Sequence, residues 1–165
     1  MNASGILYEI LATSATVTGI VGTDTGGGWK IYPLTIPQKA ALPAVRISEI
    51  AVEPFDTKSG ASTLDAIRVQ IDCYAASMLT VQQLTRAARL ALDRYRGDAW
   101  DGETVWFVDG VRFENRAWYM EEEKDVFRGS FDIQLRVHRP GYQNYLVEDD
   151  GVTPITTEQG QFIIP

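Results

Sequence analysis

The sequence predicts an α+β fold, with two layers, in which a mostly antiparallel sheet is packed by two amphipathic helices and followed by an extended C-terminal tail. Apolar residues alternate with polar ones along 66–74 and 126–138, as they do in strands that have one covered face. Residues 3–18 and 77–96 instead repeat their apolar residues at helical spacing. After Pro140 both periods disappear, so 1–140 is predicted to be one domain and 141–165 the tail.

The first 30 residues predict a helix followed by a loop. Apolar side chains recur along residues 3–18, Asn2 or Ser4 can cap the start, and glycines at 19 and 22 mark the end. The glycine-rich segment 23–29 that follows predicts a flexible loop with one aromatic residue, Trp29. It contains no phosphate-binding motif, because the three glycines lack the required spacing and no helix follows them.

Two extended segments come next. Residues 31–34 predict a short strand at a sheet edge, because Pro33 cannot donate a backbone hydrogen bond. Residues 44–48 alternate as a strand does, and the apolar phase reverses between Ile47 and Ile50, which predicts a β-bulge.

Residues 53–63 show no period and are rich in glycine, serine and threonine. A loop of this length inside a compact domain is usually either functional or disordered. We therefore expect the start of this loop to contact a partner through Glu53, Pro54, Phe55, Asp56 and Lys58.

Residues 66–74 give the clearest strand, with Cys73 on its core-facing side. Ser77 then caps a helix that is predicted to run to Arg96 and to end before Gly97. The polar face of that helix carries three arginines, which are either an ordinary solvated face or one half of a subunit contact: Arg86, Arg89 and Arg96.

The remaining strands are assigned by turn signals. Asp109-Gly110 is a strong hairpin signal and predicts two strands, 104–108 and 111–120. A charged turn, 121–125, leads to the last strand, 126–138. The tail has two apolar clusters that predict docking on this domain or on a neighbour: Tyr142, Tyr145 and Leu146, then Phe162, Ile163 and Ile164.

Charge is unevenly distributed along the chain. The net charge is −7, yet residues 1–97 have nine basic and eight acidic side chains, whereas residues 98–165 have six and fourteen. The acidic balance argues against nucleic acid as the main partner, because binding DNA requires neutralising its phosphates. The acidic C-terminal part and the arginine stripe predict two unlike surfaces.

Composition and residue counts exclude several classes of site. With one cysteine, Cys73, and one histidine, His138, the chain has no intramolecular disulfide and no ordinary structural zinc site. It has no apolar run of about 20 residues, the length of a membrane helix, and its start lacks the basic residues of a signal peptide. We expect no catalytic residues, no metal, no cofactor and no membrane, and synthesis in a cytoplasm.

Four stretches resemble a known family. The segments Lys30–Leu34, Pro37-Gln38 and Ala41–Val45 resemble the "IYP…PQ…LPAV" pattern of phage tail completion and tail-terminator proteins. The strand and helix at 68–75 and 83–92, and the late strand at 128–133, are similar to the core of the same family. The resemblance covers roughly residues 3–138.

The resemblance implies a structural virion protein that forms a hexameric ring at the head-proximal end of a long phage tail. There it would stop polymerisation of the tail tube and meet the tail-tube protein on one side and the head-neck connector on the other. DNA would only pass through its lumen, and the host bacterial cytoplasm would be the place of assembly. The alternatives are a head-completion or neck connector, a tail-tube subunit and, from another class, a small cytoplasmic enzyme or ligand-binding domain.

Overall fold

The computed structural model describes residues 2–54, 64–121 and 125–138. It contains three helices and one curled six-stranded sheet with the strand order β1-β2-β3-β6-β5-β4. The elements of the described part are α1 (Ala3–Thr13), α2 (Ala15–Val21), β1 (Ile31–Pro33), β2 (Ala44–Pro54), β3 (Leu64–Ala75), α3 (Met78–Leu92), β4 (Gly97–Trp100), β5 (Val105–Glu121) and β6 (Val126–His138).

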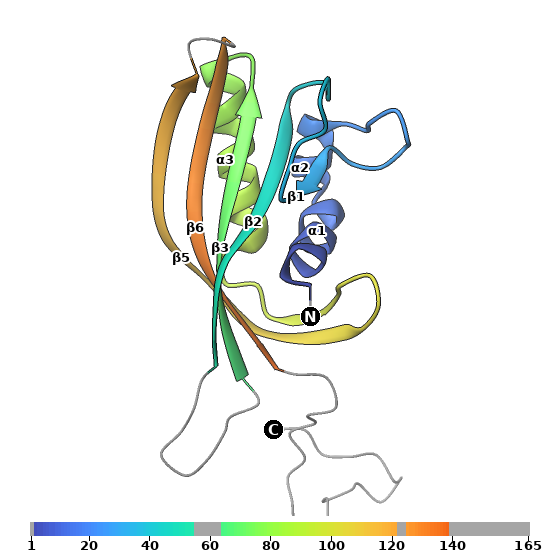
Figure 1. Cartoon of the computed structure of the whole chain (residues 1–165), viewed down its shortest axis with the longest axis vertical. Coiled ribbons are helices and arrows are strands. Elements are labelled where there is room, and N and C mark those ends of the chain that lie inside the picture. The colour runs from blue at the N-terminus through green and yellow to red at the C-terminus, as the bar shows by residue number, and fades with distance from the viewer. Residues whose placement is uncertain (1, 55–63, 122–124, 139–165) are drawn as a thin grey trace, which may run out of the picture.

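The sheet is mostly antiparallel, as predicted. β1 pairs with β2 in parallel, and the other four pairings are antiparallel. The helices lie against one face of the sheet, and its lower part curls so that β4 passes beneath the start of α1 (Figure 1). Because of this curl the expected two-layer arrangement stays a prediction.

The core lies between the helices and the concave side of the sheet. Ile67, Val69, Ile71 and Cys73 of β3 are fully buried there, as their alternation predicted. Burial raises the pKa of the Cys73 thiol to about 12, so this cysteine is a small apolar core residue with little thiolate. The bulge expected after Ile47 is present between Glu49 and Ala51.

The single helix predicted over residues 3–18 is wrong in one respect. The helix is interrupted at Ser14, and the direction of α2 is bent by 94° from that of α1. Ser14 has an extended backbone and its side chain accepts a hydrogen bond from the Val17 amide, so it caps α2 instead of continuing α1. Gly19 lies inside α2, and only Gly22 ends it. Among the described residues no single helix is long and apolar enough to cross a membrane, although this bent pair would be by length and composition.

The hairpin predicted at Asp109-Gly110 is also wrong. β5 runs without a turn from Val105 to Glu121, and a bulge between Val108 and Gly110 accommodates Asp109. β6 pairs with β5 from Phe107 to Glu121, and this tertiary pairing overrides the local turn signal. The reversal lies earlier, at Asp101-Gly102, where the notably short β4 pairs with β5 residues 105–108.

The Asp101 carboxylate ties this reversal to the start of α1. It accepts hydrogen bonds from the backbone amides of Asn2, Glu103 and Thr104, and from the Trp106 indole at 2.7 Å. Gly5 of α1 approaches closely here, since a Cβ on it would lie 2.2 Å from the Asp101 carbonyl oxygen. Burial raises the pKa of Asp101, but the four hydrogen bonds outweigh it and lower the pKa overall.

We expect the Asp101→Asn variant to be less stable than the parent at neutral pH, because an amide cannot accept these bonds as an anion does. A lowered folded-state pKa contributes stability that is present above the unfolded pKa of about 4 and is lost as pH falls. Urea unfolding from pH 7 to pH 3 should therefore show the difference between parent and variant shrinking with acidity. A constant difference would contradict this assignment.

Candidate assembly surfaces

The open face of the sheet, opposite the helices, is covered by arginine–carboxylate pairs. Asp72 is fully buried on β3 and lies between two arginines, Arg46 of β2 and Arg128 of β6. It accepts from Arg46 Nε at 3.0 Å and from Arg128 Nε at 2.9 Å. Tyr74 lies beside both guanidinium groups, 5.7 and 5.9 Å from its ring centre. This cluster fastens three adjacent strands together on the face that has no helix.

Two further clusters continue this pattern. Asp132 accepts from Arg68 at 2.7 Å and from Asn115, and Asp109 lies 2.9 Å from Arg136. The described parts of β5 and β6 contain four acidic and four basic residues. The expectation that these strands form part of an acidic surface is therefore wrong, because their net charge is zero and Asp109, Glu114 and Asp132 lie next to arginines.

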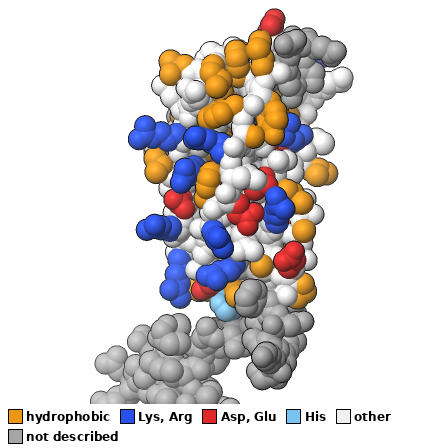
Figure 2. All heavy atoms as spheres, turned by 90° about the vertical axis from the view of Figure 1, so that its left-hand side faces the viewer, with side chains coloured by type: hydrophobic (Ala, Val, Ile, Leu, Met, Phe, Trp, Pro, Cys, Tyr) orange, Lys and Arg blue, Asp and Glu red, His pale blue; other side chains and the backbone are white. Residues whose placement is uncertain are grey.

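Four arginines without a carboxylate partner in the described chain lie at one flank. Arg86 and Arg89 project from α3, and Arg112 and Arg116 from β5. The Arg89 guanidinium stacks 4.0 Å above the Phe113 ring, which joins the two elements, and a groove between them is lined by Arg86, Arg89, Arg116, Gln82, Thr85 and Trp118. We call these four arginines the basic flank. Figure 2 shows basic side chains spread over this side of the molecule.

The free edges of the sheet differ in charge. β4 covers residues 105–108 of β5, and the Arg94 amide donates to the Val111 carbonyl at 3.2 Å, so no described strand pairs with the outer edge of β5 beyond Val111. β1 covers only residues 45–47 of β2, which leaves Ser48–Pro54 as the opposite free edge. This β2 edge presents Glu49 and Glu53, both exposed, together with partly exposed Ile50 and Val52. The β2 edge is therefore acidic, whereas the β5 edge has Arg112 and Arg116, with Glu114 between them lying 3.7 Å from Arg68 of the same chain.

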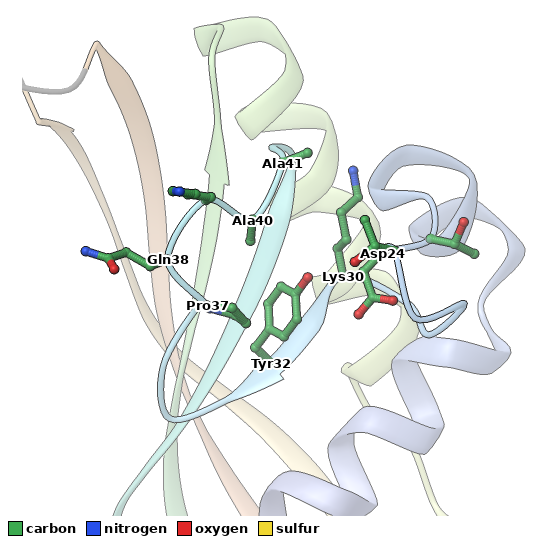
Figure 3. Close-up of a pocket in the computed structure, with 10 residues that line it drawn as sticks. Asp24, Lys30, Tyr32, Pro37, Gln38, Ala40 and Ala41 are labelled. Carbon is green, nitrogen blue, oxygen red and sulfur yellow. The ribbon is translucent and has the colours of Figure 1, made fainter.

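A hollow of about 520 Å³ lies beside β1, between the loop that precedes it and the loop that follows it. Figure 3 shows Tyr32 and Lys30 lining it near Asp24, while Gln38 points away. Lys30 is only 9% exposed, and its ammonium lies beside Gly22 at the C-terminal end of α2, where the helix dipole stabilises a cation. Lys30 therefore has a structural role.

These groups do not assemble a metal centre in the described part of the chain. No three His, Cys, Asp or Glu side chains there are grouped to hold a metal ion. The pKa of the Asp101 carboxyl is lowered by hydrogen bonds that hold the structure together. The candidate functional features of the described residues are therefore the basic flank and the acidic β2 edge.

The profile of a protein family described as "Tail completion protein gp17" matches residues 6–138. The chain belongs to the tail completion protein gp17 family. It is thus a structural virion protein of the bacteriophage type, as the resemblance in its sequence indicated.

A solved structure is similar to this tail completion protein in fold. A chain in the structure titled "Virion of native gene transfer agent (GTA) particle" superposes with a TM-score of 0.65. The two sequences are 20% identical, and the alignment covers 84% of this chain and 96% of that chain. At this identity the similarity establishes the fold alone. A search of curated proteins finds no significant match.

The contact residues predicted for this tail completion protein lie in different places. Glu53 and Pro54 are exposed at the end of β2, and Arg86 and Arg89 lie on the basic flank. Arg96 lies beyond the end of α3 at Leu92, near Asp109 and Phe107. The other members of the predicted β2 loop and tail contacts lie outside the described residues and stay predictions: Phe55, Asp56, Lys58, Tyr142, Tyr145, Leu146, Phe162, Ile163 and Ile164.

Trp29 lies in the loop 23–29, which has contacts of its own within the chain. Thr23 and Trp29 form a β-bridge, and the Asp24 side chain accepts from the amides of Gly26 and Gly28 at 2.8 and 3.1 Å. Trp29 is half-buried against the core, so part of its surface is already used within the chain. Whether it also contacts a partner stays a prediction.

Sequence reasoning missed Arg112, Arg116 and Glu49 of the tail completion protein as surface groups. Each lies on a strand beside a bulge, where the alternation that assigns a residue to one face reverses. The reversal at Ile47–Ile50 was visible in the sequence, but it did not reveal that the strand lacks a neighbour there.

Proposed function

We propose that this protein forms a hexameric ring at the head-proximal end of a phage tail, where it ends polymerisation of the tail tube and joins the tail to the head. The observation that carries the proposal is the match of the tail completion family to residues 6–138. The similarity in fold to a chain of a gene transfer agent virion supports it. In such a ring the partners are other copies of this chain, the tail-tube protein and the head-neck connector.

Opposite flanks of unlike charge suit a ring. In a ring each copy uses one patch to contact a different patch of the next copy, and closure depends on the angle between the patches. The basic flank and the acidic β2 edge lie on opposite sides of the sheet order. A tube subunit would also need contacts between rings, whereas a terminator must lack a contact that continues the stack.

The proposed role is structural and involves no catalysis. The paired carboxylates of the open face hold strands together, and Lys30, beside the hollow next to β1, is buried against the end of α2. DNA would pass through the ring lumen without specific binding.

We expect purified full-length protein, examined by negative-stain electron microscopy and analytical ultracentrifugation, to form single rings with six-fold symmetry. Particles assembled without the protein should contain tails that are not joined to heads and whose tubes vary in length. Extended tubes of the isolated protein would favour a tail-tube subunit, and joined heads with tails of normal length would favour another position in the neck. A monomer both in solution and in particles would contradict the ring.

A further inference from the structure

We propose that the free edge of β5 in one copy lies alongside the free β2 edge of the next copy, with Arg112 facing Glu53 and Arg116 facing Glu49. This inference rests on the ring of the proposed function and names the surface that would close it. The occupant of the basic edge is thus a second copy of this chain.

The spacing of the charged residues is the same on both edges. Arg112 and Arg116 pair with Gln134 and Phe131 of β6, three positions apart, because a bulge between Phe113 and Asn115 absorbs one residue. Glu49 and Glu53 pair with Val69 and Ala66 of β3, also three positions apart, because of the bulge between Glu49 and Ala51. Each pair of charges therefore spans roughly 10 Å along its strand.

The faces of the sheet also match. Arg112 lies opposite Gln134 on the open face, whereas Arg116 lies opposite the core residue Phe131 on the helix face and lines the groove beside α3. Cross-strand partners share a face. By the same reasoning Glu53, opposite Ala66, lies on the open face, and Glu49, opposite Val69, lies on the helix face. Each edge therefore places one residue of the proposed pairs on each face, so both oppositely charged pairs can form together. Glu114, at the bulge between the two arginines, lies 3.7 Å from Arg68 of its own chain.

The directions of β2 and β5 allow both charged pairs to form in one antiparallel contact. β2 is antiparallel to β3, β3 to β6, and β6 to β5, so β2 and β5 run in opposite directions. Copies that stand the same way up in a ring would therefore place β5 antiparallel to the neighbour's β2. In that orientation Arg112 reaches Glu53 when Arg116 reaches Glu49, and Phe113 and Val52, both on the helix face, become neighbours.

The alignment requires a small stagger between copies. Within one chain, Arg112 pairs with Gln134, Gln134 with Arg68, and Arg68 with Ala51. Arg112 therefore lies at the same height along the sheet as Ala51, which is two residues before Glu53. Each copy would therefore shift by two residues, about 7 Å, along the strands. An even shift keeps the faces matched, and a stagger is what tilted strands need when a sheet closes on itself. β1 occupies the β2 edge at Val45–Ile47, which confines the contact to residues 48–54.

Charge reversal tests this contact. The double variants R112E/R116E and E49R/E53R should each assemble at least tenfold more weakly than the parent, because both edges of every copy then have the same sign. An equimolar mixture of the two double variants should restore rings, since each copy then meets the opposite charge on both sides. Mass photometry would measure ring formation, and circular dichroism melting would establish that all variants are folded.

The matched control is D98K/E103K, which makes the same charge change as E49R/E53R at exposed residues on and beside β4, outside the proposed contact. It should assemble as the parent does. Rings that persist in both double variants, or doubles that are not restored by mixing, would overturn the proposed contact while leaving the ring itself intact. Absence of rings from the parent, in solution and in particles, would instead overturn the proposed function.

A disulfide provides a second readout for rings that form only in particles. Residues 112 and 53 are separated by two intervening strands within one chain, roughly 14 Å, which is too far for a disulfide. R112C/E53C should therefore give a ladder of covalently linked copies on oxidation, and either single variant should give none. Absence of the ladder from oxidised particles that contain rings would contradict the contact.

Discussion

The Asp72→Ala variant should unfold at markedly lower urea concentration, with a loss of about 3 kcal/mol in the free energy of unfolding. Removing one member of a buried ion pair typically costs about 3–5 kcal/mol, because the partner is left without compensation. We expect a loss at the lower end of this range, because the Arg46 and Arg128 side chains are 29% and 23% exposed to solvent and can be partly hydrated. The Asp72 side chain is not exposed at all.

The loss of stability in Asp72→Ala arises from contacts among three strands. Asp72 on β3 accepts hydrogen bonds from Arg46 on β2 and from Arg128 on β6. Burial lowers the pKa of Arg128, but its hydrogen bond and attraction to Asp72 outweigh this and raise it overall. Without the carboxylate, two neighbouring guanidinium groups repel each other beside Tyr74.

Asp132→Ala is the control for this prediction. It removes a carboxylate from the same face and the same kind of pair, but its partner Arg68 is half exposed and can be hydrated. Exposed pairs contribute little to stability. The loss should therefore be clearly larger for Asp72→Ala. Equal losses for the two variants, measured by urea unfolding of the full chain, would contradict the assignment of Asp72 as the central tie of the open face.

The Gly129→Ala variant should lose about 1–3 kcal/mol in the free energy of unfolding, the usual cost of inserting a methyl group into a packed core. A Cβ at this position would lie 2.4 Å from Thr85 Oγ1 and 2.5 Å from the Trp118 ring. Gly129 of β6 thus lets α3 and the Trp118 side chain of β5 approach the sheet. Since Thr85 and Trp118 also line the groove of the basic flank, the substitution should disturb that surface as well.

Gly110→Ala is the matched control, because Gly110 lies on the adjacent strand and a Cβ there would be 3.7 Å from Arg136 without a clash. We expect its unfolding midpoint to stay the same or to rise slightly, since alanine restricts the unfolded chain. Thermal unfolding followed by circular dichroism would compare the two variants. A Gly129→Ala variant as stable as Gly110→Ala would show that α3 and Trp118 can move away at little cost.

Several elements could be predicted because their determinants are local. The alternation of β3 and β6 fixed which side chains face the core, and Ser77 marked the start of α3 by its capping hydroxyl. Pro33 indicated an edge strand, and β1 is one. Periodicity and capping depend on neighbours within about four residues, so the sequence is sufficient to identify them.

Other features depended on partners distant in the chain. The turn signal at Asp109-Gly110 gave way to the pairing of β5 with β6, and Ser14 ended a helix that its neighbours would have continued. The charge count suggested an acidic C-terminal part, but Asp132 of β6 and Asp109 of β5 form ion pairs with Arg68 and Arg136 on neighbouring strands. The net charge of a segment therefore does not give the charge of the surface that it forms, because the partners of its charged side chains lie on other segments.

The sequence by itself determined the family, the alternating strands and the amphipathic helix α3, because these are properties of residue type and local spacing. Only the tertiary structure decided which strands lack a neighbour and which arginines lack a carboxylate. Arg112 and Arg116 of β5, and Glu49 and Glu53 of β2, became candidate contact residues because strand order places them at opposite free edges with equal spacing. Strand order follows from the pairing of segments far apart in the chain, and the pattern within any one segment does not contain it.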